Sequence, residues 1–417
     1  MRGLPGRSSR SSGRPFTVRV SNARALDPDV VRAWSSLEAR ALEPNAYLSP
    51  HFVLPALRYL DPDVRALAIR VERAPESATD GHAGETAGEP AAARLVGMGI
   101  FEWVKGTRAF PLPHLVAYRS RHSFSSGILL DRAHAAEALA ALVEHLASTQ
   151  IWRGHGLELE GTWGDGPTFA LIAQATAAHG GHVDHEEWNV HTRSVLEPFA
   201  DRARIEANLS AQGRDLRRRR RRLEEQGSVS WALHRRGGIR APSVEAFLDL
   251  EHRGWKGETR TSLRSNPADE GFFREAVARF AGEERAVFTE LLLDGEVIAS
   301  TSNFVSGRAG FAFKIGWRPD LAKVSPGVLN EMEFLTRMYG EPSLGDLDFW
   351  DSGAAEGSYI DKLWPGRRPL VSMAIATTRL GRSVMSLVRA ARAIRKRHRA
   401  RQPVPASAAT APPEPRD

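Results

Sequence analysis

Residues 313–338 read FKIGWRPDLAKVSPGVLNEMEFLTRM, and this stretch decides the fold. It begins as a strand that ends near Trp317, crosses a loop, and continues as a helix predicted over 326–339. The Ser-Pro-Gly tripeptide at 325–327 opens that helix: Ser is able to cap it, Pro suits its first turn, and Gly leaves the backbone accessible. Such a helix start presents unpaired amides to an anion, and it also serves elsewhere as a simple cap.

The segments on both sides of this stretch alternate between helix and strand patterns. A three-strand meander precedes it, joined at DG and SGR turns that are typical of hairpins. The strands of that meander are 286–294, 296–305 and 309–317. The other elements predicted for the second half are helix 201–226, strand 228–235, helices 243–254 and 269–282, strand 346–351, a short helix and strand 369–377. Two similar α/β halves of the α+β type are implied.

The first half follows the same logic. Its predicted elements are helix 133–148, strand 156–161, helix 167–179 and a strand pair around 183–197. Strands 66–72 and 94–104 flank an Ala- and Gly-rich loop over 74–93, which lacks periodicity and is predicted to be exposed.

Charge is distributed unevenly along the 417 residues, whose formal net charge is +7. Residues 1–14 hold four Arg and no acid, and residues 379–417 hold ten Lys plus Arg against two acids. Residues 15–378 carry 43 basic and 48 acidic side chains, so the basicity belongs to the two ends. Because the chain has no cysteine, a disulfide framework, thiolate metal sites and a cysteine nucleophile are excluded.

The two ends of the chain suggest where the protein resides. Residues 1–15 are predicted to be a disordered leader without the apolar stretch of a secretory signal, and no run is long enough for a membrane span. We therefore expect a cytoplasmic protein. Residues 379–401 have helical apolar spacing with Arg elsewhere, which fits either an interfacial helix at an anionic membrane or a solvated tail helix. Its apolar positions are Leu380, Val384, Leu387, Ala391 and Ile394. Residues 402–417 are predicted to be disordered.

Several segments together resemble a known group of proteins. They are LSPHFV (48–53), RDLRRRRRRLEEQG (214–227), LEHRGWKG (250–257), LLLDGEVIAS (291–300), KVSPGVL (323–329), LDFWDSG (347–353) and YIDKLW (359–364). The chain resembles the GNAT acetyltransferase superfamily, and more closely the double-domain acetyltransferase-like proteins associated with cellulose biosynthesis, relatives of Fem-type transferases. The resemblance implies tandem GNAT-like domains over 16–200 and 201–378, each a mixed, largely antiparallel sheet flanked by helices.

The resemblance also implies acetyl-CoA or another acyl-CoA as co-substrate. The implied strand-end contacts are Gly316, Trp317 and Arg318, and the implied pyrophosphate loop comprises Val324, Ser325, Gly327 and Val328. The familiar GNAT phosphate loop has several spaced glycines, whereas Gly327 is the single glycine here. Fem-type relatives use aminoacyl-tRNA, which stays an alternative donor.

Acyl transfer to an amine needs a base, dipoles on the developing oxyanion and an acid for the leaving thiolate. Glu251 and His252 end a predicted helix and are the candidate bases; the alternative is that Glu251 pairs with a nearby Arg and His252 caps the helix. Asp348 and Asp351 lie at the end of a predicted strand, where ligand groups occur in open α/β sheets. The alternative for Asp351 is a cap of the next helix.

Tyr359 and Lys362 lie three residues apart, so they share one surface of a helical turn. The resemblance implies that Tyr359 is the thiolate acid, and the alternative is a packed aromatic residue. Lysine is rare, with six against 51 Arg, and four lysines fall between 256 and 362. Lys314 and Lys362, with Trp255, are therefore the candidate substrate contacts, because a lysine retained in an Arg-rich chain suits a carboxylate or phosphate.

An arginine run and a group of histidines are two further features of the sequence. The run Arg217–Arg222 predicts a solvated or substrate-facing helix, with contact to a polyanion as the alternative. His182, His185 and His191 do not share one face of a strand and no HExxH motif is present, so no metal site is predicted.

These patterns predict an acyltransferase that moves an acyl group, expected to be acetyl, to an amine or hydroxyl by direct transfer in a ternary complex. The acceptor is expected to be a small molecule or an envelope or polysaccharide precursor. The protein is placed in the cytoplasm or at the inner membrane face, and nucleic acid is not expected except tRNA. The alternatives are a Fem-like aminoacyl-tRNA-dependent transferase and a non-catalytic GNAT-like binding module.

Overall fold

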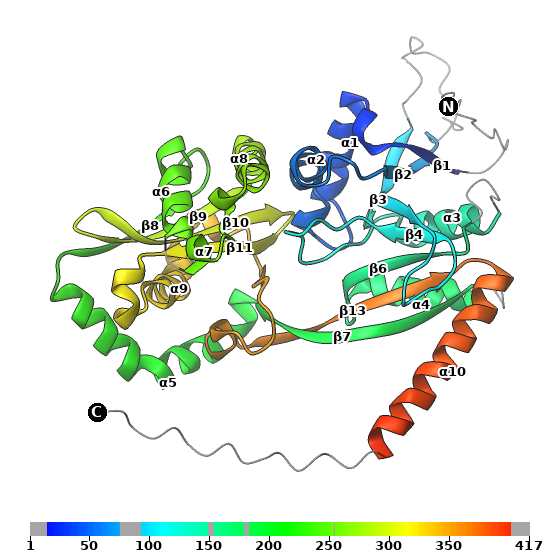
Figure 1. Cartoon of the computed structure of the whole chain (residues 1–417). Coiled ribbons are helices and arrows are strands. Elements are labelled where there is room, and N and C mark those ends of the chain that lie inside the picture. The colour runs from blue at the N-terminus through cyan, green and yellow to red at the C-terminus, as the bar shows by residue number, and fades with distance from the viewer. Residues whose placement is uncertain (1–14, 76–92, 149–153, 179–182, 254, 402–417) are drawn as a thin grey trace, which may run out of the picture.

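The computed structural model describes residues 15–75, 93–148, 154–178, 183–253 and 255–401. The expected leader and C-terminal tail, and most of the 74–93 loop, lie outside these ranges. The described residues form one 13-stranded sheet in the order β1-β2-β3-β4-β6-β13-β7-β12-β11-β10-β9-β8, with β5 paired to β3. Helices cover this sheet in two groups, one over each half (Figure 1). The α/β class of the α+β type, with a mixed and largely antiparallel sheet, is confirmed.

The first half contains seven strands of the sheet and four helices among the described residues. Its strands are β1 (Phe16–Asn22), β2 (Ala66–Arg73), β3 (Arg94–Val104), β4 (His114–Ala117), β5 (Leu129–Leu130), β6 (Gly156–Trp163) and β7 (Asp184–Leu196). Its helices are α1 (Pro28–Ala39), α2 (Pro50–Pro55), α3 (Ala135–Ser148) and α4 (Pro167–Ala178). The predicted pairing of strands across the 74–93 loop is confirmed, because β2 and β3 are antiparallel neighbours.

The second half begins with a long helix and carries the predicted meander. Its helices are α5 (Pro198–Glu224), α6 (Ala241–His252), α7 (Trp255–Glu258), α8 (Pro267–Gly282) and α9 (Pro326–Arg337), and α10 (Arg379–Arg401) ends the described chain. Its strands are β8 (Val229–His234), β9 (Ala286–Leu293), β10 (Glu296–Ser306), β11 (Ala309–Trp317), β12 (Phe349–Asp351) and β13 (Gly366–Ala376). The antiparallel order β9-β10-β11 confirms the meander.

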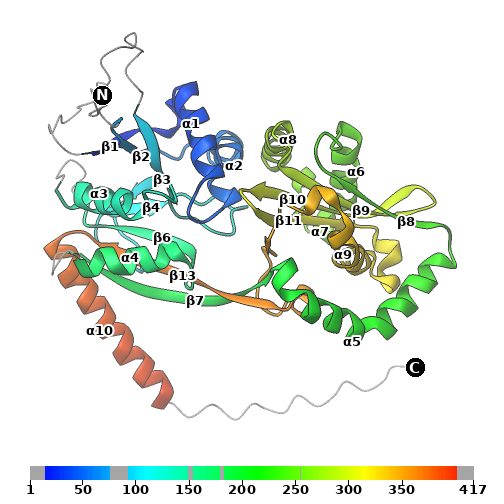
Figure 2. The ribbon, with the colours of Figure 1, turned by 180° about the vertical axis from the view of Figure 1, so that it is seen from behind.

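Strands β7 and β13 depart from the sequence prediction. Residues 183–197 were predicted as a strand pair, but they form the single strand β7, which pairs with β13 along almost its whole length. Strand β13, predicted within the second domain, lies between β6 and β7 of the first half. The two ribbons run side by side beneath the molecule in Figures 1 and 2. A boundary at residue 200 therefore does not separate the two halves in space.

A phenylalanine-rich core joins the two halves. Phe52 of α2 makes edge-to-face contacts with Phe272 of α8, Phe304 of β10 and Phe313 of β11, with ring centroids 5.1 to 6.2 Å apart. Full burial of each such side chain contributes roughly 1.5–3 kcal/mol to folding. The position of α2 and α8 against β11 is therefore fixed by the core and not by surface contacts alone.

Candidate donor and acyl-transfer site

Strands β11 and β12 separate after a short stretch of pairing. They are parallel neighbours from Ala309–Phe311 against Phe349–Asp351, and beyond this point β11 has no strand partner on that side among the described residues. The amide of Arg318 bonds to the carbonyl of Ile298 on β10. Because backbone groups alternate along a strand, those of Ile315 and Trp317 face the unpaired side. We call residues 312–317 on this side the open edge of β11.

The open edge leads to the start of α9, where Ser325 adopts a conformation that the sequence did not indicate. Ser325 has a left-handed backbone, with φ of 52°, and its side chain caps no helix amide. Its hydroxyl instead donates to the carbonyl of Ala322 and accepts a hydrogen bond from Arg219 of α5. The predicted capping role of the Ser325 side chain is therefore wrong, and a guanidinium lies beside the N-terminus of α9.

Gly327 permits close packing of α9 on β11. A Cβ atom at this position would lie 3.0 Å from the Cδ1 atom of Ile315 and 3.4 Å from Trp317. The amides of Val328 and Leu329 already bond to the carbonyl of Ser325, and proline has no amide hydrogen to offer. Within the described first turn, the amide of Gly327 is therefore the one left for a ligand. The side chain of Val324 is buried in the core, whereas Val328 is partly exposed.

The strand-end residues predicted to contact a cofactor have different surroundings. Gly316 packs against the end of α6, since a Cβ there would lie 2.6 Å from the backbone nitrogen of Glu251. Trp317 packs toward α9 next to Gly327. Arg318 bonds to Asp320 and Glu296 at the β10 side of the strand end. Of these three residues, Trp317 lies closest to the α9 start.

Glu251 and Lys256 meet the open edge of β11. The Nζ atom of Lys256 donates to the Glu251 carboxylate at 3.2 Å and to the backbone carbonyl of Ile315 at 2.9 Å. The second Glu251 oxygen accepts the amide of Leu263 at 2.8 Å, and the residue is only 2% exposed. Glu251 therefore pairs with a lysine and not with the expected arginine, and both its oxygens are engaged. The side chain of Trp255 lies outside the described residues.

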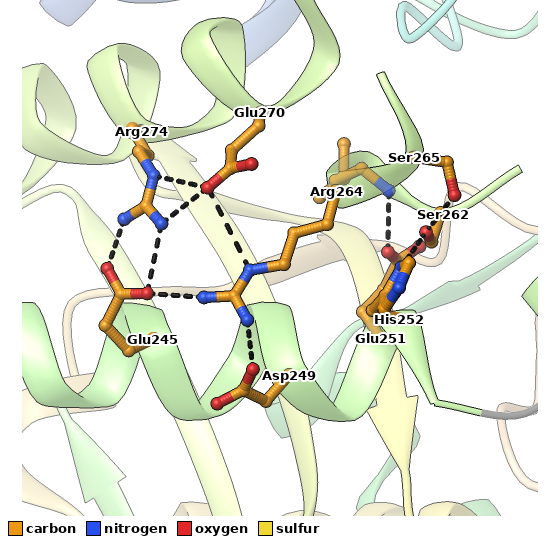
Figure 3. Close-up of polar contacts among 10 residues, drawn as sticks. Glu245, Asp249, Glu251, His252, Ser262, Arg264, Ser265, Glu270 and Arg274 are labelled. Atoms are coloured by element: carbon orange, nitrogen blue, oxygen red, sulfur yellow. Dashed lines mark hydrogen bonds and ion pairs between the residues drawn. The ribbon is translucent and has the colours of Figure 1, made fainter. Parts of the chain in front are cut away.

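His252, the next residue, contacts the same 262–265 turn that Glu251 binds through the amide of Leu263. Its Nδ1 atom is 2.8 Å from the hydroxyl of Ser262, which contacts Ser265 in turn (Figure 3). Figure 3 also shows Arg264 and Arg274 bridging acidic residues of α6 and α8. This network fixes α6 against α8 and so fixes the position of Glu251 beneath β11.

Lys314 lies on the same face of β11 as Gly316 and is largely enclosed by protein. Its pKa is lowered by burial and by the charge of Lys256, and only partly restored by Glu251 and Asp269. Its Nζ atom lies 5.4 Å above the ring of Phe313. The neighbouring His122, bonded to Asp269 at 2.6 Å, has its pKa lowered to about 4 by burial and by Lys314. The first half thus contributes a histidine to the surroundings of this lysine.

The two predicted aspartates of the 346–351 strand are not near the α9 start. The strand is shorter than predicted, and Asp348 precedes it, where it bonds to Arg308 at 2.8 Å at the opposite end of β11 from Gly327. Asp351 is 1% exposed, pairs with buried Arg193 at 3.2 Å and accepts the amide of Gly353. Asp351 therefore stabilises the turn after β12 and does not cap the next helix, which begins at Tyr359 with Ser358 as its N-cap.

Tyr359 lies on the α9 side of the site. It opens a 3-10 helix, Tyr359–Lys362, so the predicted one-turn relation to Lys362 holds and both residues are exposed. Burial and the nearby Glu331 carboxylate raise the pKa of the Tyr359 phenol, although 43% of the residue remains exposed. Glu331 of α9 accepts a hydrogen bond from Trp364 at 2.7 Å, and burial raises its pKa to about 7.

Helix α5 presents arginines toward solvent next to this site. Leu216 and Leu223 are buried against the body, whereas the opposite face exposes arginine. In the C-terminal half of α5 the exposed arginines are Arg214, Arg217, Arg218, Arg221 and Arg222. Except for Arg218, which pairs with Asp215, they make no ion pair within the described chain.

A cavity of about 600 Å³ lies between the halves at the other end of β11. Its lining combines residues of both halves, including Glu38, Arg132, Arg235, Arg285, Arg308 and Asp348. Glu38 is 1% exposed and pairs with Arg285 through one oxygen. Its other oxygen is buried without a partner among the described residues.

Sequence reasoning missed five residues that the structure brings to the site or its edges: His122, Arg219, Lys256, Asp269 and Glu331. The rarity of lysine was a usable signal for Lys256, because Lys256 and Lys314 are both among the six lysines of the chain. Glu331 follows Gly327 by four residues and so shares its helix face, which was a usable signal. Arg219 lies in the run Arg217–Arg222, which did not single it out from its neighbours. No local pattern marks His122 or Asp269, because α8 and the 118–125 segment meet only in the folded chain.

Two general features of the described residues bear on function. They contain no group of three or more His, Asp or Glu side chains arranged to hold a metal ion. No helix among them is long and apolar enough to cross a membrane.

Comparison with known proteins identifies part of the chain. Residues 210–356 match the model of a family described as an acetyltransferase (GNAT) domain. This range includes the C-terminal part of α5, the meander, α9 and β12, and therefore the open edge of β11. Residues 210–356 are thus similar to a GNAT-type acetyltransferase domain. A search of curated proteins found no match.

Several solved structures align with most of the chain at low sequence identity. FemX aligns with a TM-score of 0.51 at 12% identity, over 86% of this chain and 98% of that chain. A conserved protein of unknown function from Bacteroides thetaiotaomicron gives 0.49 at 11% identity, over 86% and 99%. A tandem GNAT protein from the clavulanic acid biosynthesis pathway gives 0.38 at 15% identity, over 87% and 99%. At these identities the likeness to FemX concerns the fold alone.

Proposed function

We propose that the protein transfers an acyl group from an acyl-CoA to an amine or hydroxyl by direct attack in a ternary complex. The observation that carries this proposal is the open edge of β11, which ends at the α9 N-terminus beside Arg219. An extended amide-bearing chain pairs with such an edge by strand addition, and a phosphate suits a helix N-terminus with an adjacent guanidinium. Acyl-CoA combines both groups in one molecule.

The length of the edge fits this assignment. From Ala312 to Trp317 the strand advances about 17 Å at 3.4 Å per residue, a span that an extended pantetheine arm covers. A diphosphate at Gly327 and Arg219 would then place the thioester near the Phe313 bulge of β11. Lys256 binds the carbonyl of Ile315 on this edge, so the arm must share or displace that contact.

The chemistry requires an attacking amine without its proton. In the reaction the acceptor nitrogen forms a C–N bond to the acyl carbon, the C–S bond breaks, and the thiolate takes up a proton. We propose that Lys256 binds the carbonyl oxygen of the thioester, because its Nζ atom lies at the open edge of β11 beside Glu251. We propose that Lys314 takes the amine proton, because a lysine with lowered pKa suits a base. Tyr359 is the proposed acid for the thiolate.

The cavity between the halves is the proposed acceptor site. It begins near Arg308, so an acceptor entering there would meet the thioester midway along β11. The unpartnered oxygen of Glu38 is complementary to an ammonium group, and the arginines suit hydroxyl or phosphate groups. An amine-bearing sugar of an envelope or polysaccharide precursor combines these features.

Calorimetric titration with acetyl-CoA and longer acyl-CoAs tests the donor. Arg219→Ala should weaken binding about tenfold, since a charge-assisted hydrogen bond contributes roughly 1.5–3 kcal/mol. Arg217→Ala is the matched control, because Arg217 lies on the exposed face of the same helix and does not contact Ser325. Equal affinity for both variants would refute this phosphate placement. Gly327 is unsuited to the test, because any side chain there meets Ile315.

Steady-state kinetics on an identified acceptor tests the catalytic assignments. Lys314→Met should lower kcat by 10²–10⁴-fold, the usual contribution of a general base, and should remove the acidic limb of the pH–rate profile. Tyr359→Phe should slow thioester cleavage and leave acyl-CoA affinity unchanged. A rate within a few fold of wild type would remove either residue from its assigned role.

One observation favours a second candidate, an aminoacyl-tRNA-dependent transferase. The exposed arginine face of α5 continues to Arg219 at the α9 start, so a polyanion bound along α5 would reach the same site. Competition decides between the donors. The aminoacyl-tRNA-dependent proposal replaces the acyl-CoA proposal if two results are found. Charged tRNA should bind the protein and lose affinity in an Arg217→Glu, Arg221→Glu double variant, and acyl-CoA should not bind. Binding of neither donor would leave a non-catalytic module.

A further inference from the structure

Helix α10 carries an apolar stripe that faces away from the body. Its members follow each other at alternating intervals of four and three residues, which keeps them on one side of a helix. They are Leu380, Val384, Leu387, Ala391 and Ile394. Leu380, Leu387 and Ile394 are 54%, 70% and 57% exposed, high values for large aliphatic side chains.

The contacts that hold α10 explain this orientation. Gly381 lies so close to β6 that a Cβ atom would be 2.5 Å from the carbonyl of His155. Met385 is 2% exposed and packs with Phe110 in a small core cluster. Arg389 pairs with Asp184 and Glu186 on β7. These residues recur at four-residue intervals on the side opposite the stripe.

The described anchoring contacts run from Gly381 to Arg392, past the middle of the helix. The last one described is Arg392, which bonds to the carbonyl of Ala109. In Figures 1 and 2 the remainder of α10 projects beyond the body. The stripe is thus held outward by contacts between Gly381 and Arg392, and its large members Leu380, Leu387 and Ile394 are exposed.

The charge of α10 indicates what covers the stripe. Residues 379–401 contain nine Lys plus Arg and no acid. The stripe spacing also suits a two-helix coiled coil, but two copies of this helix would bring eighteen cations together without a compensating carboxylate. A surface that is apolar beneath a layer of anionic groups complements both properties at once.

We propose that α10 docks the protein on anionic lipid bilayers, with Leu387 and Ile394 inserted among the acyl chains and the basic residues at the headgroups. The helix lies in the plane of the interface. Because its other side is fixed to β7 and β13, docking sets the orientation of the body as well as its location.

Sedimentation with lipid vesicles tests the proposal on the full chain. Vesicles of phosphatidylcholine with 30% phosphatidylglycerol should bind at least tenfold more protein than pure phosphatidylcholine vesicles, and binding should fall as salt is raised from about 0.05 M to 0.5 M. A Leu387→Glu, Ile394→Glu double variant should lose at least tenfold in affinity. Phe199→Glu is the matched control, because Phe199 is a 64% exposed apolar residue outside α10.

The fold and the alternatives are checked on the same samples. Thermal unfolding should give equal midpoints for wild type and both variants, since all three positions are exposed. Analytical ultracentrifugation reports self-association. A dimer that the α10 variant dissociates, equal binding to neutral and anionic vesicles, or no binding to either would overturn the proposal.

Discussion

Helices α5 and α10 are the two arginine-rich helices of the molecule, and they lie against it in opposite ways. Helix α5 buries Leu216 and Leu223 and turns its arginines to solvent. Helix α10 turns Arg389 and Met385 to the body and leaves Leu387 70% exposed. The same class of sequence therefore covers a core in one place and presents an apolar surface in the other.

The difference lies in what each helix meets. Helix α5 lies over apolar side chains of α9 and the meander, such as Leu291 and Phe334, so its leucines find partners. Helix α10 meets Asp184 and Glu186 at the start of β7, and these carboxylates pair with Arg389. Amphipathic spacing defines two faces of a helix, but the receiving surface decides which one is buried.

Truncation of one leucine in each helix should give the largest contrast. Leu223→Ala, at a fully buried position, should lower the free energy of unfolding by about 3 kcal/mol. Leu387→Ala should change it by less than about 0.5 kcal/mol. Urea unfolding followed by circular dichroism measures both values. Similar losses in the two variants would mean that α10 is buried against something in solution.

Glu331 should make the stability of the protein depend on pH, and this effect should involve the α5 region and not α10. Helix α5 holds the 362–364 segment through Asn208 and Gln212, and Trp364 of that segment bonds to Glu331. Burial raises the Glu331 pKa from 4.5 to about 7. The native state thus binds more protons than the unfolded state between these values, so stability should fall by up to about 3 kcal/mol as pH rises across this window.

The Glu331→Gln variant is the test of that dependence. The free energy of unfolding, measured from pH 4.5 to 7.5, should fall less steeply with rising pH in the variant than in wild type. Leu216→Ala should also reduce the slope, because loosening α5 admits water to Glu331. An unchanged slope in Glu331→Gln would assign the pH dependence to other groups.

Met385→Ala should loosen α10 without unfolding the body. Loss of this buried anchor should lower the local opening free energy by about 2 kcal/mol, which corresponds to roughly thirtyfold faster amide exchange in α10. Hydrogen exchange with mass spectrometry resolves the helix from the rest. Leu387→Ala, two residues away and exposed, is the control and should leave exchange unchanged.

Arg389→Ala should have the smallest effect. Its ion pairs with Asp184 and Glu186 involve a side chain that is 46% exposed, and exposed pairs contribute roughly 0.2–1 kcal/mol. The expected result is a loss of about 0.5 kcal/mol in the local stability of α10 that 0.5 M salt reduces. A loss above about 2 kcal/mol would show that Arg389, and not Met385, is the main anchor.

Most helices and strands followed from periodicity, but their partners did not. The meander and α9 were predicted closely because hydrophobic alternation and turn residues are local signals. Residues 183–197 contain no glycine or proline before Pro198, which was sufficient reason to read one strand and not two. The place of β13 between β6 and β7 depends on pairing across about 170 residues, and no local pattern reports it.

In the candidate site, too, local features were predicted from the sequence and long-range contacts were not. Ser325, Gly327 and Lys314 were recognised from their spacing and rarity, and the structure gathers them around β11. Arg219 reaches Ser325 from 106 residues away, and Trp364 donates a hydrogen bond to Glu331, whose pKa burial raises. Neither contact is visible in the sequence, because both arise where α5 and the 3-10 helix meet α9.

The position of β13 has a consequence for how the chain matures. Strands β6 and β7 are next to each other in sequence order, yet they can complete their sheet only when residues 366–376 arrive between them. During synthesis the ribosome must therefore add some 170 residues while two strand edges of the first half wait unpaired. The last strand closes the first half, which makes the two halves a single unit of folding and of degradation.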